Sequence, residues 1–238
     1  MHRYQILIEY VGTNFVGWQI QSKGKSIQKS IQIKLSKLLK EKISLIGSGR
    51  TDSGVHAIEQ SAHFDSKKEI RNLDKFLRSI NHFVNDMGIS IINIKKRNIN
   101  FHARFSAKQR VYKYIIFNRL SRPSIEKERG WHIIKGLDIS LMKKGAKKLL
   151  GTKDFSTFRS SSCNAKSPIR TMKSIKIKSI KGRIEIQFKS QSFLQQQVRS
   201  MVGCLKYLAS KKWNLRKFDF VLKSKKRILC APPAPAEG

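Results

Sequence analysis

Acidic residues are scarce in this chain. It has 238 residues and contains 15 Asp and Glu against 50 Lys and Arg, so its formal net charge is +35 and its isoelectric point is near 10.6. Positive charges at this density repel one another on the surface. The excess therefore indicates a polyanionic partner, of which nucleic acid is the first candidate. A compositional bias of the source towards lysine would contribute, but it leaves the electrostatic consequence unchanged. An acidic membrane surface is the weaker alternative.

Cysteines, metal-binding patterns and long apolar runs are few or missing. The three cysteines, Cys163, Cys204 and Cys230, lie far apart without a CxxC pair, which argues against both a disulfide framework and a structural zinc site. The six histidines show no HExxH-type spacing, so we predict no metal. No run approaches the roughly 18 apolar residues of a membrane-spanning helix, and the first residues lead directly into a strand pattern. We therefore expect no membrane segment, no signal peptide and a cytoplasmic location.

The periodicity of apolar residues predicts an α+β fold in the first half of the chain. Strands are expected at 3–9, 42–46, 57–64 and 89–94, and helices at 27–40 and 73–83, with Ser26 as the N-cap of the first helix. The order β-α-β-β-α-β is that of the split β-α-β, or ferredoxin-like, arrangement.

The second half is expected to repeat this pattern. Strands are predicted at 110–117, 174–180 and 183–189, and helices at 139–150 and 193–209. The proline-rich end, 231–238, cannot form a central strand because proline has no N–H to donate, so this half is predicted to lack its last strand. The sequence thus predicts two duplicated ferredoxin-like domains, 1–105 and 106–238, whose antiparallel sheets are joined around a central cleft.

One loop between two predicted strands contains more chemistry than a chain reversal needs. Residues 47–57 have the sequence GSGRTDSGVHA, whereas a hairpin requires only two to five residues. A purely structural interpretation is that Asp52 caps the loop or pairs with Arg50, since loops commonly use Asp and Gly for turns. The alternative is a catalytic carboxylate on a loop that is held by a rigid sheet.

Aromatic residues alternate with arginines at the predicted boundary between the halves. The segment FHARF, 101–105, contains His102, Arg104 and Phe105, and the next strand begins with Arg110 and Tyr112. Such a pattern suits RNA, because bases stack on aromatic rings while guanidinium groups bind phosphates. An ordinary strand with tyrosines in the core and arginines in solvent is the alternative.

Arg199 falls on the apolar face of the last predicted helix, beside Val198 and Val202. An arginine in that position must extend to solvent or meet a carboxylate, because a buried unpaired charge costs several kcal/mol. With so few acids in the chain, Asp52 is an attractive partner, and a bidentate pair would keep that carboxylate ionised. P-loop and dinucleotide-binding glycine patterns are absent, and no second acid lies near Asp52 in sequence.

Taken together, these motifs resemble the tRNA pseudouridine synthase A family. The segment GRTDSGVHA at 49–57 is similar to the family motif GRTDAGVHA. Further matches follow in the family's order: 12–15, 17–19, Asn81, 101–105, Arg110, Tyr112, Tyr114, 154–155, 170–171, 193–194, 198–199 and Gly203. The chain departs from the family pattern at Val11, at Asn85, and after Gly238, where the family's final Gly-Leu-Tyr-Leu strand does not follow.

The resemblance implies the pseudouridine synthase fold and isomerisation of uridine to pseudouridine at positions 38, 39 and 40 of the tRNA anticodon arm, without metal or cofactor. By analogy, Asp52 is the nucleophile, which attacks either ribose C1′ or the uracil ring. Tyr112 would stack on the flipped-out uracil, Arg199 would pair with Asp52, and Arg50 would hold the place of the flipped nucleotide. The resemblance also implies a homodimer and RNA contacts from His56, His102, Arg104, Phe105 and Arg110.

Two other functions share some of these features. A non-catalytic RNA-binding protein on the same ferredoxin-like unit would explain the charge and the aromatic residues, but it has no use for a carboxylate that faces phosphates. An RNA or DNA glycosylase would use Asp52 but would release the free base. Pseudouridine formation without a change of mass distinguishes the synthase from the glycosylase.

Overall fold

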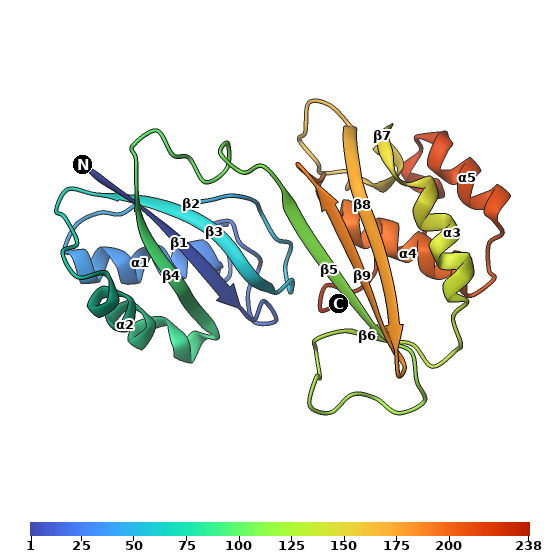
Figure 1. The fold of residues 1–238 in the computed structure, drawn as a ribbon, viewed down its shortest axis with the longest axis horizontal. Helices are drawn as coiled ribbons and strands as arrows, with labels where there is room; N and C mark the ends of the chain where they lie inside the picture. Colours follow the sequence, from blue (N-terminus) through green and yellow to red (C-terminus); the bar gives the residue numbers. More distant parts are fainter. The chain divides into compact units, whose positions relative to one another are not determined.

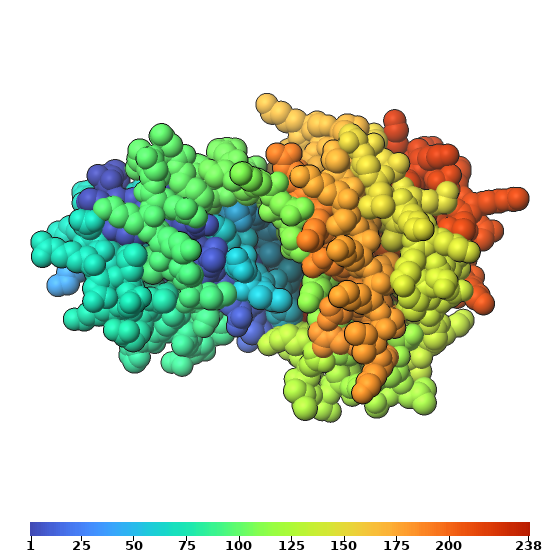
Figure 2. Space-filling view, viewed as in Figure 1, coloured from blue at the N-terminus to red at the C-terminus, as the bar shows by residue number.

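The computed structural model describes residues 1–238, which divide into two compact units, Met1–Ala107 and Lys108–Gly238. This division lies at residue 107, whereas the sequence pattern places it at 105. Each unit consists of one β-sheet with helices packed on it (Figure 1). The units can be followed by colour in the space-filling view, from blue to green for the first and from green to red for the second (Figure 2).

The first unit has the predicted ferredoxin-like topology. Its sheet has the order β2-β3-β1-β4 and is antiparallel throughout, with strands β1 (His2–Tyr10), β2 (Ile46–Gly47), β3 (Ala57–Ser66) and β4 (Ile89–Arg97). The helices are α1 (Ile27–Leu39) and α2 (Leu73–Val84), and the short η1 (Asn85–Met87) follows α2. The core lies between the helices and one face of the sheet, because every second residue of β1 is buried there, from Tyr4 to Tyr10.

Strand β2 is much shorter than the predicted 42–46. The backbone N–H groups of Ile43 and Leu45 donate to side chains of α1, namely to Ser36 Oγ at 3.0 Å and to Gln32 Oε1 at 3.2 Å. Ile43 and Leu45 alternate and are buried, as in a strand, but their amides bond to a helix instead of a neighbouring strand. The apolar alternation therefore predicted the burial correctly and the pairing wrongly.

The second unit contains a five-stranded sheet with the order β6-β5-β9-β8-β7. Its strands are β5 (Arg110–Phe117), β6 (Trp131–His132), β7 (Gly151–Asp154), β8 (Ile169–Ile180) and β9 (Arg183–Ser190). Helices α3 (Ile139–Lys148), α4 (Gln197–Ala209) and α5 (Leu215–Ser224) share a core with it, and η2 (Ser156–Phe158) and η3 (Arg227–Leu229) are short turns. The neighbours β5-β9-β8 repeat β1-β3-β2 of the first unit.

Several details of the second unit differ from the prediction. Strands β6 and β7 and helix α5 were not predicted, and β6 pairs parallel to β5, so this sheet is not purely antiparallel. Strand β6 occupies the edge of β5 that corresponds to the position of β4 beside β1. Helix α4 begins at Gln197 and not at 193, because Gln196 has a φ of 60°, which no α-helix accommodates. Lys181 and Gly182, the two residues between the predicted strands 174–180 and 183–189, form a tight turn and both have positive φ.

The last nine residues, 230–238, are called the C-terminal tail. They form no strand, yet Ala231 and Ala234 are buried in the core of the second unit. Ala234 N donates to Arg199 O of α4 at 3.0 Å, and the buried Tyr114 of β5 donates its hydroxyl to Pro235 O at 2.9 Å. Helix α4 presents a glycine where the tail passes, since a Cβ at Gly203 would lie 2.1 Å from Pro232 O. The tail is therefore a structural layer of this unit.

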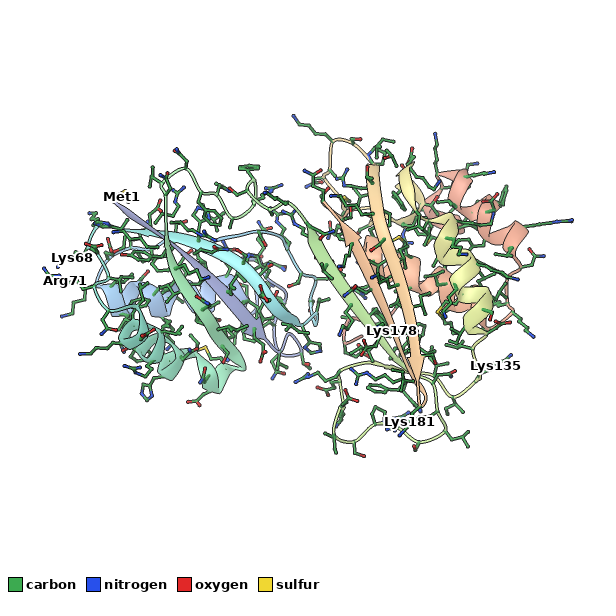
Figure 3. The ribbon with its side chains drawn as sticks, viewed as in Figure 1. Met1, Lys68, Arg71, Lys135, Lys178 and Lys181 are labelled. Atoms are coloured by element: carbon green, nitrogen blue, oxygen red, sulfur yellow. The ribbon has the colours of Figure 1, made fainter.

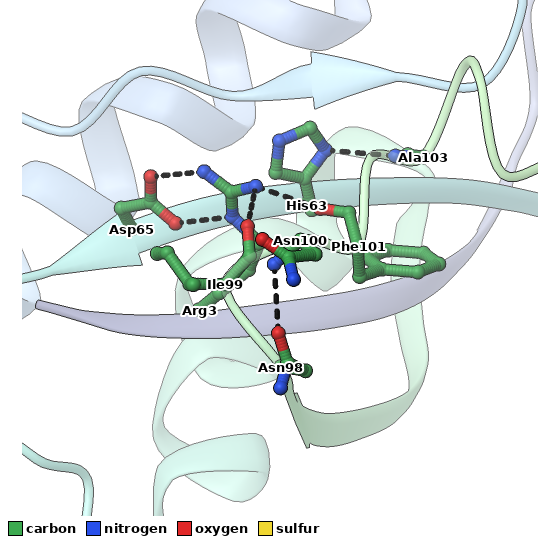
Figure 4. A network of polar contacts seen from close by, with 8 residues as sticks. All are labelled: Arg3, His63, Asp65, Asn98, Ile99, Asn100, Phe101 and Ala103. Carbon is green, nitrogen blue, oxygen red and sulfur yellow. Dashed lines mark hydrogen bonds and ion pairs between the residues drawn. The ribbon is translucent and has the colours of Figure 1, made fainter.

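In the first unit, a polar network fastens the segment after β4 to the sheet (Figure 4). Arg3 forms two hydrogen bonds to the carboxylate of Asp65, at 2.7 and 2.6 Å, and donates to Ile99 O and Phe101 O. The buried His63 accepts a hydrogen bond from Ala103 N at its Nδ1, at 3.1 Å. Burial, the charge of Arg3 and the proximity of His102 lower the pKa of His63 to about 4. His63 is therefore neutral at pH 7 and acts as a hydrogen-bond acceptor.

This buried histidine should make the first unit sensitive to mild acid. A histidine in the unfolded chain binds its proton near pH 6.5, whereas His63 in the folded unit does so near pH 4. Between these values the unfolded state holds more protons, so the free energy of unfolding should fall by about 2–3 kcal/mol from about pH 7 to about pH 4.5. Urea unfolding at the two pH values measures this loss.

His63→Gln retains an acceptor for Ala103 N but cannot titrate, so its unfolding free energy should lose less over this interval. His82→Gln, a change at an exposed position of α2, is the matched control and should behave as the unsubstituted protein does. An identical loss in His63→Gln and in the unsubstituted protein would contradict the prediction.

Candidate active site and nucleic-acid interface

The loop that contains Asp52 is fastened along its backbone to the segment that follows β1. Trp18 N donates to Thr51 O at 3.1 Å, on one side of Asp52, and Gly54 N donates to Phe15 O at 3.3 Å, on the other. Within the loop, Val55 N donates to Asp52 O at 3.2 Å. The carboxylate is thus carried by a backbone whose position is set from both sides.

Such close approach requires a glycine on the facing segment. Gly17 has a φ of 106°, and a Cβ there would lie 2.6 Å from Thr51 O. This contact gives a physical reason why the motifs at 17–19 and 49–57 occur in one sequence. The glycine of the first motif leaves room for the backbone of the second.

Side chains add three further contacts to the same loop. The Tyr10 hydroxyl and Thr51 Oγ1 are hydrogen-bonded at 2.8 Å, and Ser53 Oγ donates to Phe15 O at 3.2 Å. His56 Nδ1 accepts a hydrogen bond from Gly12 N at 3.0 Å. His56, predicted to contact RNA, therefore has a structural role in joining the two segments.

The segment 101–106 forms a small aromatic surface on the first unit. The rings of His102 and Phe105 lie 4.4 Å apart, and the Arg104 guanidinium lies over the Phe105 ring at 5.8 Å. His102 Nδ1 accepts from the backbone N–H groups of Arg104 and Phe105, at 3.2 and 3.4 Å, which fixes the ring against its neighbours. Phe105 is 78% exposed, and a large aromatic ring presented to solvent beside a cation is suited to stacking on a nucleobase.

In the second unit, Tyr112 lies near the start of β5. Its ring meets the Phe193 ring edge to face at 5.0 Å, and the side chain packs on the margin of the core. Arg110, two residues earlier on the same strand, donates from Nη1 to Gln191 O in the connection between β9 and α4. The beginning of β5 and the connection 191–196 therefore form one neighbourhood.

Arg199, in the first turn of α4, is held by the C-terminal tail. Its Nε donates to Ala234 O at 2.8 Å, and Ala234 N donates back to Arg199 O at 3.0 Å. The helix begins directly after Gln196, whose φ of 60° is unusual for a residue with a side chain. Such outliers persist where the surrounding structure holds them, often at functional sites.

The predicted residues are thus collected into three groups. Arg50, Asp52 and His56 share the loop 47–57, called the clamped loop because the segment after β1 holds it by hydrogen bonds. His102, Arg104 and Phe105 share the aromatic surface 101–106, and both groups belong to the first unit. Arg110, Tyr112 and Arg199 belong to the second unit. The predicted central cleft and the predicted pairing of Arg199 with Asp52 both require residues from the two units together. Both remain predictions.

Two supporting residues were missed from the sequence. Tyr10 binds Thr51 but occurs at the end of a strand as an ordinary core residue, so no sequence signal distinguishes it. Phe193 contacts the Tyr112 ring, and although the family match at 193–194 includes it, nothing in the sequence indicates this contact.

The structure offers no metal site and no membrane-spanning helix. No group of three or more His, Cys, Asp or Glu side chains converges as the ligands of a metal ion do. None of the helices has both the length and the apolar character needed to cross a membrane.

Comparison with known proteins gives consistent results. The sequence profile of a family described as tRNA pseudouridine synthase matches residues 6–106 and 146–238. The chain is 83% identical to "tRNA pseudouridine synthase A" of Pelagibacter ubique (strain HTCC1062), over all of this chain and 97% of that protein. It is 38% identical to proteins of the same name from Parvibaculum lavamentivorans and Maricaulis maris, over all of this chain and 96% and 95% of theirs.

The matched residues include the clamped loop, the aromatic surface and the first turn of α4. A family profile that covers most of the chain, together with relatives of this identity, confirms the family that the motifs predict. The chain belongs to the tRNA pseudouridine synthase A family, an isomerase family whose mixed α+β fold it shares.

Proposed function

We propose that this protein isomerises uridine to pseudouridine at positions 38, 39 and 40 in the anticodon arm of tRNA, with Asp52 as the nucleophile. The support is the family membership together with one structural observation, the clamped carboxylate loop. The reaction leaves the composition of the nucleotide unchanged: the bond from N1 to C1′ breaks, the uracil turns, and C5 bonds to C1′. One proton leaves C5 and one is gained at N1.

A nucleophile must be aimed as well as reactive. The backbone bonds of Thr51 and Gly54 to the segment after β1 hold Asp52 between two fixed points. Positioning of this kind lowers the entropy cost of reaching the transition state. Attack at C1′ and attack at the uracil ring both use an ionised carboxylate from this loop.

The second unit would supply the contacts to the uracil. Tyr112 is oriented by the edge-to-face contact with Phe193, and we propose that its ring stacks on the flipped-out base. Arg199 is oriented by Ala234, and we propose that its guanidinium pairs with Asp52 and keeps the carboxylate ionised. Arg50, next but one to Asp52, would occupy the place that the flipped nucleotide leaves.

The remaining groups are proposed to bind the tRNA around that nucleotide. Phe105, with His102 and Arg104, offers a stacking surface beside a cation, and Arg110 and His56 complete the proposed RNA contacts. By analogy with the family, we propose a cytoplasmic homodimer that needs no metal or cofactor.

Binding of tRNA should depend steeply on salt. The chain carries a formal charge of +35. Much of this charge is exposed, as at the basic residues labelled in Figure 3, which are Lys68, Arg71, Lys135, Lys178 and Lys181. Each neutralised phosphate releases counterions, with a log–log slope of about −0.7 to −0.9 per contact. The dissociation constant should therefore rise about a thousandfold or more from roughly 50 to 200 mM salt. Fluorescence anisotropy with labelled tRNA measures it, and a nearly flat dependence would refute the electrostatic account.

The fit between Gly17 and the catalytic loop should be visible in turnover. In Gly17→Ala, the added methyl group would lie 2.6 Å from Thr51 O at a φ of 106°, so the loop must move. A displacement of about 1 Å at a reacting group lowers kcat by roughly 10- to 100-fold. Gly136→Ala is the matched control, because a Cβ at Gly136 meets nothing within 4 Å. Equal kcat values for the two folded variants would show that the clamp does not position Asp52.

Asp52→Asn should abolish pseudouridine formation and spare tRNA binding. An amide cannot act as the nucleophile, and removal of one negative charge from a strongly positive surface does not weaken its attraction for RNA. Tritium release from 5-tritiated uridine in tRNA measures turnover, and a filter-binding titration measures affinity. Detection of free uracil in the same reaction distinguishes a glycosylase from a synthase.

The matched control is Asp74→Asn, which alters an exposed carboxylate in the first turn of α2. It should retain full turnover. Substantial pseudouridine formation by folded Asp52→Asn protein would eliminate Asp52 as the nucleophile. Loss of turnover in both variants would show that any lost carboxylate impairs the enzyme.

A further inference from the structure

Two of the three cysteines meet in the second unit, although they lie 26 residues apart in sequence. Cys204 lies in α4 and is completely buried, and Cys230 is the first residue of the C-terminal tail and is half-buried. Their sulfur atoms lie 3.4 Å apart. A disulfide bond is about 2.05 Å long, so closure requires the two sulfurs to approach by only about 1.4 Å. Both cysteines are free thiols in the structure.

The two thiols are not equivalent. The hydrogen bond between the two thiols and the nearby charge of Arg227 lower the pKa of Cys230, whereas this same hydrogen bond and burial raise the pKa of Cys204. Arg227, three residues before Cys230, lies close enough that both its charge and a side-chain hydrogen bond lower the pKa of the Cys230 thiol. A thiolate is favoured beside such a group, and the thiolate is the reactive form of cysteine. Cys230, partly accessible, is thus the attacking residue and Cys204 the residue behind it.

We propose that Cys204 and Cys230 form a reversible disulfide by exchange with a low-molecular-weight disulfide, and that this bond fastens the C-terminal tail to α4. The Cys230 thiolate attacks one sulfur of the small disulfide, forms a mixed disulfide and releases one small thiolate. Cys204 then gives up its proton and attacks the Cys230 sulfur, which releases the second small thiolate. Two protein thiols are oxidised by two electrons, one small disulfide is reduced to two thiols, and the protons of the protein thiols end on them.

The bond would reinforce a connection that is otherwise noncovalent. Near the other end of the tail, Ala234 is bound to Arg199 through two hydrogen bonds, and Pro235 O is bound by Tyr114. Between these points the tail passes Gly203 at close range. A covalent link at Cys230 restricts the unfolded chain, so the oxidised protein should unfold at a higher temperature than the reduced protein.

The test uses the full chain, first reduced with dithiothreitol and then incubated with oxidised glutathione. The expected product carries no glutathione and is lighter than the reduced protein by two hydrogen atoms. It has two fewer thiols that can be alkylated, and dithiothreitol returns it to the starting mass. Its Tm should exceed that of the reduced protein by roughly 5–10 °C. Peptide mapping should place the link between Cys204 and Cys230.

Three variants make the result specific. Cys163→Ser should close the disulfide as the unsubstituted protein does. Cys204→Ser should stop at the mixed disulfide, with glutathione bound to Cys230, and Cys230→Ser should leave Cys204 unmodified because it is completely buried. If Cys204→Ser fails to fold, the Cys230→Ser comparison decides alone. The proposal would be overturned if glutathione stayed bound to Cys230 of the unsubstituted protein. It would also be overturned if the thiols of Cys204 and Cys230 were both still free after incubation.

Discussion

Much of the first unit depends on one contact, the backbone-to-backbone docking of the segment after β1 onto the loop 47–57. The hydrogen bonds from Trp18 N to Thr51 O and from Gly54 N to Phe15 O cannot form unless two chains approach to within the length of a hydrogen bond. Gly17 permits this approach because it has no Cβ. The ferredoxin-like sheet brings the two segments to the same end, since β1 and β3 are neighbours and antiparallel. The fold thereby converts a flexible glycine-rich loop into a fixed support for a carboxylate.

In the second unit, the C-terminal tail holds Arg199, as the segment after β1 holds the loop of Asp52 in the first unit. Arg199 lies near the start of a mostly buried helix, where an arginine without partners would be costly. The C-terminal tail supplies a carbonyl from Ala234 and at the same time fills the space beside Gly203 and Tyr114. A proline-rich segment suits this task, because it packs as an irregular layer without needing the hydrogen bonds of a sheet. The same layer brings Cys230 to Cys204.

The scarcity of acids shapes how charge is distributed. Asp65, Glu185 and Asp219 each pair with two basic groups or with a bidentate arginine, and nearby cations contribute to the lowered pKa of each. These acids neutralise lysine and arginine within the fold and leave the surplus positive charge for a partner. His63 follows the opposite logic: it is kept neutral by burial, so that it can accept a hydrogen bond from Ala103.

The sequence alone determined the alternation of apolar residues, and with it β1, α1, β3, α2 and β4 and the ferredoxin-like order of the first unit. It also identified the family, because the motif at 49–57 needs only local residue identity to be recognised. Tertiary structure decided everything that depends on a distant partner. Ile43 and Leu45 bond to side chains of α1 instead of extending β2, Gln196 delays the start of α4, and Cys204 meets Cys230. Local periodicity reports which face of a segment is buried, but the identity of the group that it meets is a property of the whole fold.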